Sequence, residues 1–321
     1  MNQTCRICSS NAQHATYVCH EKMFGCPDEF PYFQCSDCGC LQIAAVPVDL
    51  GRFYPANYHS FHSQIIPQKG LKSRLAAARD FSMATNAGFL GKLINQFIPT
   101  RPDVLSLGSV PLRRENRILD VGCGGGQLLC FLHRAGFHWV TGADPFLSGD
   151  IEAQPGVVVR KLTLEQIQEK FDLIMLHHVF EHMESGLEAL KLCRERLLPG
   201  GKILLRFPTA DSEAWKLYRQ DWVQLDAPRH LFLHTRTSFN LLVKKTGLKI
   251  EKWFCDSTTF QFWGSELYQK NQPLFDRTGK ATLPENHFSE MEMKAFAQRT
   301  KKVNAAQQGD QVVALLTYDS I

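Results

Sequence analysis

Alternating glycines that follow an acidic residue are the part of this sequence best suited to hold a ligand. Asp120, Gly122, Gly124 and Gly126 lie between a short apolar run and a helix-like stretch that begins at Gln127. Glycines let the backbone approach a ligand closely because no Cβ atom stands in the way. The first turn of the following helix presents free N–H groups at the same place. The pattern predicts a strand, a turn and a helix that bind a nucleotide-like ligand.

The residues around these glycines exclude two common nucleotide sites. A nicotinamide-binding turn needs a third glycine in the spacing G-x-G-x-x-G, and counted from Gly122 that position holds Gln127. A phosphate-binding P-loop needs Gly-Lys-Ser/Thr, which does not follow. A second acidic residue, Asp144, ends the next apolar stretch about 20 residues further on, where a carboxylate can accept hydrogen bonds from ribose hydroxyls. Two alternatives stay open: Asp144-Pro145 as a plain turn, and a glycine turn without a ligand.

Cysteines near the N-terminus predict a metal site. Seven of the eleven cysteines lie in the first 40 residues, and four of them form two Cys-x-x-Cys pairs, Cys5 with Cys8 and Cys35 with Cys38. Two such pairs can complete a tetrahedral shell of four thiolates around one zinc ion. A closed shell leaves no open position for catalysis, so we expect a structural or substrate-handling role. Disulfides, redox-active thiols or an empty site are the alternatives.

Elements that alternate along the chain after Arg117 must position these residues. Strands are expected at 118–121, 138–143, 157–159, 171–176, 202–207, 248–255 and 311–318, and helices at 127–132, 164–170, 187–197 and 238–246. Such alternation indicates a doubly wound parallel sheet, whose ligands lie beyond the carboxyl ends of the strands. Upstream, residues 72–97 have near-helical apolar spacing, 99–114 are expected to be a loop, and the aromatic segment 46–63 is expected to pack as a connection.

The chain resembles class I S-adenosylmethionine (SAM) methyltransferases. Asp120-x-Gly122-x-Gly124-x-Gly126 resembles their first motif, and Phe171–His182 resembles the FDxI…HVLEH segment of the ubiquinone O-methyltransferase-like branch. Residues 198–201 resemble the LKPGG turn, and residues 226–231 resemble a D-x-P-x-H-L element found in bacterial members, several of which carry an N-terminal zinc region. The resemblance implies a Rossmann-like seven-stranded sheet. It also implies a SAM site made by Asp120, Gly122, Cys123, Gly124, Gly126, Asp144, Pro145 and His177.

Methyl transfer mainly requires alignment of a nucleophile with the methyl group, and a base helps where the nucleophile holds a proton at neutral pH. We expect His178, His230 and Glu181 to be the catalytic residues, with His178 and His230 nearest the reacting atom. Two alternatives remain for the first segment. Glu181 and His182 could cap the next helix or pair with each other, or His178 and His182 could hold a metal ion.

The loop before His230 carries aromatic and charged residues. Trp222, Asp226 and Arg229 could bind an acidic or sugar-like substrate, or the loop could pack on the sheet edge with Arg229 paired to Asp226. The stretch from Asp256 to Asp310, which precedes the last strand, could form an additional cap.

Composition narrows the class of function. The net charge of +4 is too small to indicate a nucleic-acid partner, and no apolar run is long enough for a membrane span. Without a secretion-type N-terminus, a cytoplasmic location is expected.

The predicted organisation is a zinc-ribbon-like module at 1–45, a linker with helices at 46–112 and a methyltransferase domain at 113–321. A small-molecule acceptor such as a sugar, polyketide or envelope precursor is favoured. Ribosomal RNA methylation and a non-catalytic SAM-binding scaffold remain the alternatives.

Overall fold

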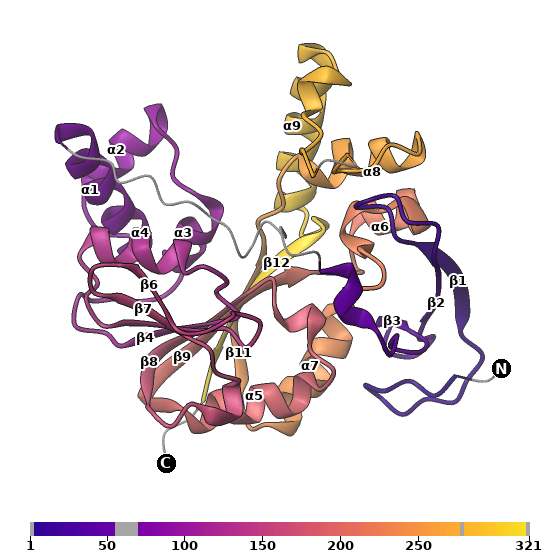
Figure 1. Ribbon diagram of the computed structural model, residues 1–321, viewed down its shortest axis with the longest axis horizontal. Helices are drawn as coiled ribbons and strands as arrows, with labels where there is room; N and C mark the ends of the chain where they lie inside the picture. The colour runs from indigo at the N-terminus through magenta and orange to yellow at the C-terminus, as the bar shows by residue number, and fades with distance from the viewer. Residues whose placement is uncertain (1–2, 55–69, 277–278, 319–321) are drawn as a thin grey trace.

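The computed structural model of this chain describes residues 3–54, 70–276 and 279–318. Its central element is an eight-stranded sheet in the order β11-β12-β9-β8-β4-β5-β7-β6 (Figure 1). The strands span Ile118–Val121 (β4), Val140–Ala143 (β5), Ile151–Gln154 (β6), Val157–Arg160 (β7), Phe171–His177 (β8), Leu197–Pro208 (β9), Lys249–Cys255 (β11) and Gln311–Thr317 (β12). Five neighbouring strands, from β9 to β7, run parallel, whereas β12 is antiparallel to β9 and to β11.

Two apolar layers cover the faces of this sheet. One face packs against α1 (Leu71–Thr85), α3 (Pro102–Leu107) and α4 (Gln127–Ala135), and α2 (Phe89–Phe97) lies on α1. The other face packs against α5 (Gly186–Glu195) and α7 (Arg236–Lys245), as Figure 1 shows. The parallel strands are buried on both faces, which explains the nearly continuous apolar run of β8. The predicted doubly wound fold is therefore confirmed.

Several local expectations were wrong. Residues 164–170 form only the 3-10 turn η2 (Leu164–Gln166) instead of a helix. Residues 99–114 contain the helix α3, whose Pro102 occupies a first-turn position where a missing N–H costs nothing. The sheet has eight strands among the described residues, one more than the seven implied by the family resemblance, because β6 pairs antiparallel with β7 at the edge.

The N-terminal residues form a second, smaller sheet. Strands β1 (Ala15–His20), β2 (Glu29–Gln34) and β3 (Leu41–Ile43) are antiparallel, and the short strand β10 (Phe232–Leu233) adds to β3 from far along the chain. The 3-10 turn η1 (Leu50–Phe53) follows, and Phe53 is buried. The rest of the aromatic connection, including Tyr58 and Phe61, lies outside the described residues.

Residues between β11 and β12 form an additional layer. Helices α8 (Phe260–Gln269) and α9 (Glu290–Ala305) stand beside α6 (Glu213–Tyr218), above the end of the sheet in Figure 1. The 3-10 turns η3 (Phe180–His182), η4 (Arg219–Asp221), η5 (Val223–Leu225) and η6 (Pro284–Asn286) complete the described elements. A small apolar cluster joins α8 to η5 and to Met23 of the N-terminal region. No helix among the described residues is long and apolar enough to cross a membrane.

Candidate active site

A cavity of about 1020 Å³ opens at the carboxyl ends of the parallel strands. Its wall includes Gly122, Asp144, His178 and His230. Pockets for a single small ligand usually measure about 300–1,000 Å³. The volume of this cavity lies at the upper end of that range.

The glycine turn closes one end of this cavity. Gly122 follows β4 with φ +66°, and its amide donates to Ala143 O at 2.7 Å. A Cβ atom at Gly122 would lie 2.6 Å from Val179 Cγ2, so a side chain does not fit there. The turn leads directly into α4 at Gln127, as the sequence pattern predicted.

Asp144 fixes the glycine turn to the strand beside it. Its Oδ2 accepts from the Gly124 amide at 2.8 Å, and its Oδ1 accepts from the Phe146 amide at 2.9 Å. The residue is 4% exposed and borders the cavity together with Pro145. A carboxylate has about four acceptor positions, so it can still accept bonds from a diol. The cradle at Gly122 and this carboxylate fit the adenosyl part of SAM.

The other residues assigned to the cofactor lie behind the cavity wall. Asp120 is buried in β4, and burial raises the pKa of its carboxyl well above the usual value, with Asp103 and Asp144 acting in the same direction. Burial lowers the pKa of His177 to about 3, and both ring nitrogens lack a partner among the described residues. Of the eight assigned residues, three border the cavity: Gly122, Asp144 and Pro145. Five do not: Asp120, Cys123, Gly124, Gly126 and His177.

Three histidines surround one buried carboxylate. Glu181 is fully buried; His178 Nδ1 lies 3.3 Å and His230 Nε2 lies 3.9 Å from its Oε1. Burial alone would raise the pKa of Glu181, but His178, His182 and His230 lower it to about 2. The structure thus brings together all three predicted catalytic residues, His178, Glu181 and His230.

One further arrangement concerns metal binding. The ligand atoms of Glu181, His182 and His230 all lie within 4.8 Å of one another, a spacing that one ion could bridge. His178, considered with His182 for a metal site from the sequence, is not part of this group.

Hydrogen bonds assign different roles to the two histidines that border the cavity, His178 and His230. His178 Nε2 lies 3.1 Å from Arg206 Nη1, which can only donate, so the lone pair of that nitrogen is occupied. His230 Nδ1 lies 2.7 Å from Gln224 O, which can only accept, so this nitrogen carries the proton. The Nε2 lone pair of neutral His230 is therefore free. Burial, together with His182, lowers the pKa of His230 to about 4, so the ring is neutral at pH 7.

The loop before His230 is part of the protein interior. Trp222 and Arg229 are both fully buried. Arg229 forms ion pairs with Asp226 Oδ1 at 2.6 Å and with Glu21 Oε1 at 2.7 Å. Burial would raise the pKa of Asp226, but the Arg229 guanidinium lowers it below the usual value. The expected pairing of Arg229 with Asp226 is confirmed, and this guanidinium is occupied by carboxylates of the protein itself, whereas Asp226 of the same loop borders the cavity.

The sequence did not single out much of the cavity wall. Apolar and aromatic side chains from the N-terminal region and from α8 border it, namely Met23, Leu50, Tyr54, Phe260, Trp263 and Phe275. These residue types also form ordinary cores, and only the tertiary structure places them at one cavity. The Tyr54 hydroxyl lies 3.2 Å from His182 Nδ1, a contact that no sequence motif indicates.

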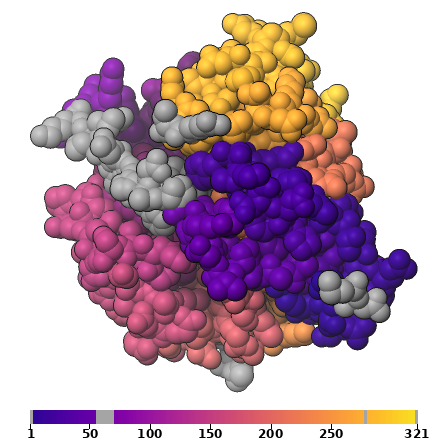
Figure 2. All heavy atoms as spheres, turned by 45° about the vertical axis from the view of Figure 1, so that its right-hand side comes forward, coloured from indigo at the N-terminus to yellow at the C-terminus, as the bar shows by residue number. Residues whose placement is uncertain are grey.

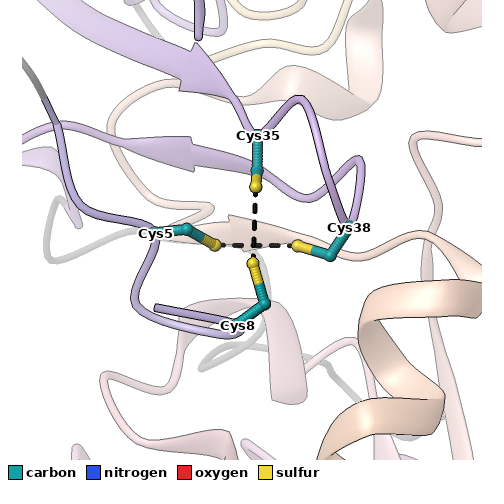
Figure 3. A group of neighbouring side chains, drawn as sticks. All are labelled: Cys5, Cys8, Cys35 and Cys38. Carbon is teal, nitrogen blue, oxygen red and sulfur yellow. Dashed lines mark hydrogen bonds between the residues drawn. The ribbon is translucent and has the colours of Figure 1, made fainter. Parts of the chain in front are cut away.

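The four predicted zinc ligands converge at one point (Figure 3). Cys5 Sγ lies 3.6 Å from Cys38 Sγ, and Cys8 Sγ lies 3.5 Å from Cys35 Sγ. Four thiolates about 2.3 Å from one zinc ion would be about 3.8 Å apart, so the group fits a tetrahedral site. All four are free cysteines, as are Cys19, Cys26 and Cys40, which lie outside the group.

Comparison with known proteins defines the class. A family model described as a methyltransferase domain matches residues 89–252. The chain belongs to this methyltransferase family, and with the fold and cofactor cradle above it is a SAM-dependent methyltransferase.

Curated relatives include ubiquinone biosynthesis O-methyltransferases. The protein of Histophilus somni is 31% identical over 39% of this chain and 58% of its own length. That of Cereibacter sphaeroides is 38% identical over 44% of this chain and 63% of its own length. The chain thus spans about three fifths of the length of these two curated relatives.

Solved structures with a similar fold are more distant. A SAM-dependent methyltransferase from Archaeoglobus fulgidus is 20% identical, with 70% of this chain and 97% of that chain covered and a TM-score of 0.40. One from Mesorhizobium loti is 16% identical, with 67% and 99% covered and a TM-score of 0.39. Neither likeness bears on the substrate.

Proposed function

We propose that this protein transfers the methyl group of SAM to a hydroxyl or amine of a small, largely apolar acceptor. The observation that carries the proposal is the single cavity that joins Gly122 and Asp144 to His178 and His230. Among the described residues, its wall contains no Lys or Arg that could neutralise a phosphate or a nucleic-acid backbone. The ubiquinone O-methyltransferase relatives support a small-molecule acceptor.

Roles follow from the hydrogen bonds. We assign the cofactor to the turn at Gly122 and the carboxylate of Asp144, with Asp120, Cys123, Gly124, Gly126, Pro145 and His177 shaping that end of the site. Bound SAM supplies an electrophilic methyl group. His230 Nε2 accepts the proton of the acceptor as its nucleophilic atom gains the methyl group. Glu181 and Asp226, whose oxygens lie 3.9 and 3.8 Å from this nitrogen, then stabilise the charged ring. His178, whose Nε2 accepts from Arg206, lies with its Nδ1 3.3 Å from Glu181 Oε1 and adds to the polar surroundings of that carboxylate.

We also assign zinc to the four cysteines Cys5, Cys8, Cys35 and Cys38, in a structural role. The division into a module at 1–45, a linker at 46–112 and a catalytic domain at 113–321 belongs to the same proposal. Supporting it are the converging thiols and the separate N-terminal sheet.

Transfer from methyl-labelled SAM to a panel of phenols, hydroxylated polyketides and free sugars tests the function. The same panel is run with His230→Ala and His178→Ala, and calorimetry measures the binding of S-adenosylhomocysteine. We expect turnover to fall by a factor on the order of a hundred or more in His230→Ala, with cofactor-product affinity preserved. His287→Ala, an exposed histidine outside the cavity, is the matched control. A folded chain that fails to bind S-adenosylhomocysteine, or normal turnover in His230→Ala, would refute the proposal.

A further inference from the structure

The segment that carries His230 lies along the N-terminal module, which is defined here as residues 3–54. Figure 2 shows this module, in indigo, packed against the later parts of the chain. Backbone pairing joins β10 to β3, and the Ile43 amide donates to Leu231 O at 3.1 Å. The Thr235 hydroxyl, at the start of α7, donates to Cys38 O at 2.5 Å within the second cysteine pair. The module is therefore bonded to the residues that follow His230.

Arg229 connects the same segment to the module through its side chain. Its guanidinium donates to Glu21 Oε1 at 2.7 Å, to Phe53 O at 3.1 Å and to Asp226. Glu21 is held in turn by the amides of Phe24 and Cys26. Arg229 and Glu21 are both almost completely buried, so neither charge can be solvated by water if the other moves. This pair fixes the distance between the module and the residue directly before His230.

Tyr32 of β2 holds His230 itself. Its hydroxyl donates to the His230 carbonyl oxygen at 2.8 Å, and its side chain is fully buried. No backbone amide among the described residues donates to this carbonyl. The catalytic domain contributes bonds to the neighbouring residues, from Leu231 N to Glu181 O at 2.8 Å and between His182 Nδ1 and Arg229 O at 2.9 Å. His230 thus lies between the N-terminal module and the catalytic domain, and its main-chain carbonyl accepts its hydrogen bond from the module.

We infer that the N-terminal module sets the position of the His230 ring in the cavity, with Tyr32 and Arg229 as positioning residues. The module is then part of the active site, because it orients the group that faces the acceptor and also supplies Met23, Leu50 and Tyr54 to the cavity wall. The inference takes the role of His230 from the proposed function, whereas its test requires no turnover.

The test is the nuclear magnetic resonance spectrum of the full chain labelled with ¹⁵N-histidine, in which the signals of His230 are identified from their loss in His230→Gln. The ring nitrogens report the tautomer that the Gln224 carbonyl now fixes by accepting from Nδ1. Tyr32→Phe removes only the hydroxyl that holds the His230 carbonyl. If the ring then moves away from Gln224 O, the Nδ1 hydrogen bond weakens, and we expect the ratio of the two neutral tautomers of His230 to change by up to about five-fold, which corresponds to about 1 kcal/mol for that bond.

Tyr17→Phe is the matched control. Tyr17 faces Tyr32 in the β1–β2 register, and its hydroxyl has no hydrogen bond to the described residues. Glu21→Gln is an independent variant, because it removes the charge opposite Arg229 while one side-chain oxygen remains for the Phe24 and Cys26 amides. It also decides the outcome if Tyr32→Phe does not fold.

A change of the His230 signals in Tyr32→Phe or Glu21→Gln, but not in Tyr17→Phe, supports the inference. Unchanged signals in both variants, or an equal change in Tyr17→Phe, would overturn it. Calorimetry with S-adenosylhomocysteine separates the two proposals. Absent binding by the wild-type chain removes the methyltransferase proposal, whereas the His230 spectrum still reports whether the module positions that ring.

Discussion

Asp144 shows how one side chain can order a site before any ligand is bound. Its carboxylate accepts from the amides of Gly124 and Phe146, and so holds the glycine turn against the loop after β5. The same oxygens border the cavity, where a ribose diol could donate to them. The sequence predicted the residue from its spacing to the glycines, but the bonds to the two amides required the structure.

We expect Asp144→Ala to lower the affinity for S-adenosylhomocysteine by about 10- to 100-fold, since hydrogen bonds to a charged group contribute about 1.5–3 kcal/mol. Calorimetric titration measures the change. Asp150→Ala is the control, because Asp150 also accepts from a backbone amide, that of Lys161, but lies outside the cavity. Equal affinities in the two folded variants would argue against a role for Asp144 in cofactor binding.

At the scale of elements, alternation of strands and helices was predictable because burial on two faces leaves a clear apolar pattern. Short elements were less predictable. Instead of the helix expected at 164–170, only the three-residue turn η2 forms. The helix α3 was not predicted, because the prolines at 102 and 111 indicated a loop. In both segments tertiary packing decides the conformation, since a single turn gains little from its own hydrogen bonds.

Asp310, the residue directly before β12, carries a buried carboxyl that makes the free energy of unfolding depend on pH. Asp310 accepts from Trp222 Nε1 at 3.1 Å and so joins β12 to the turns before η5. Burial raises the pKa of Asp310 from 3.8 to about 6. Because the folded state binds this proton more tightly than the unfolded state, the stabilising contribution is complete below pH 4. It is lost as the pH rises through about 6.

Asp310→Asn removes this titration and keeps an oxygen for Trp222. Relative to wild type, we expect the variant to gain about 2–3 kcal/mol in free energy of unfolding between pH 4 and pH 7.5, from a shift of about two pKa units. Urea unfolding of both proteins at the two pH values measures it. A wild-type minus variant difference that is the same at both values would contradict the assignment.

At the scale of the whole molecule, the N-terminal module and the catalytic sheet share one hydrophobic core. Tyr32, Leu41 and Phe53 of the module belong to the same buried cluster as Leu205 and Phe207 of β9. Strand β10 completes the module's own sheet from within the catalytic part. The two parts should therefore unfold together rather than in separate steps.

Cys38→Ser tests this joint unfolding at the proposed zinc site of the four cysteines. We expect loss of about one zinc ion per chain and a fall of several kcal/mol in the free energy of unfolding, because binding energy at a structural zinc site is folding energy. Metal analysis and thermal unfolding measure the two effects. Cys26→Ser, outside the thiol group, should change neither. A metal-free wild-type chain that is fully folded, or a module that melts separately, would contradict the prediction.

The sequence by itself determined the methyltransferase fold, the glycine turn with Asp144, and the four cysteines, because each depends on local spacing or on burial patterns within single elements. Only the tertiary structure decided that Arg229 is bound internally by Glu21, and that Tyr32 and Tyr54 reach the histidines of the cavity. These contacts join residues far apart in the chain, so no local pattern predicts them. In the sequence, an apolar or aromatic residue that packs in a core cannot be distinguished from one that borders a ligand site.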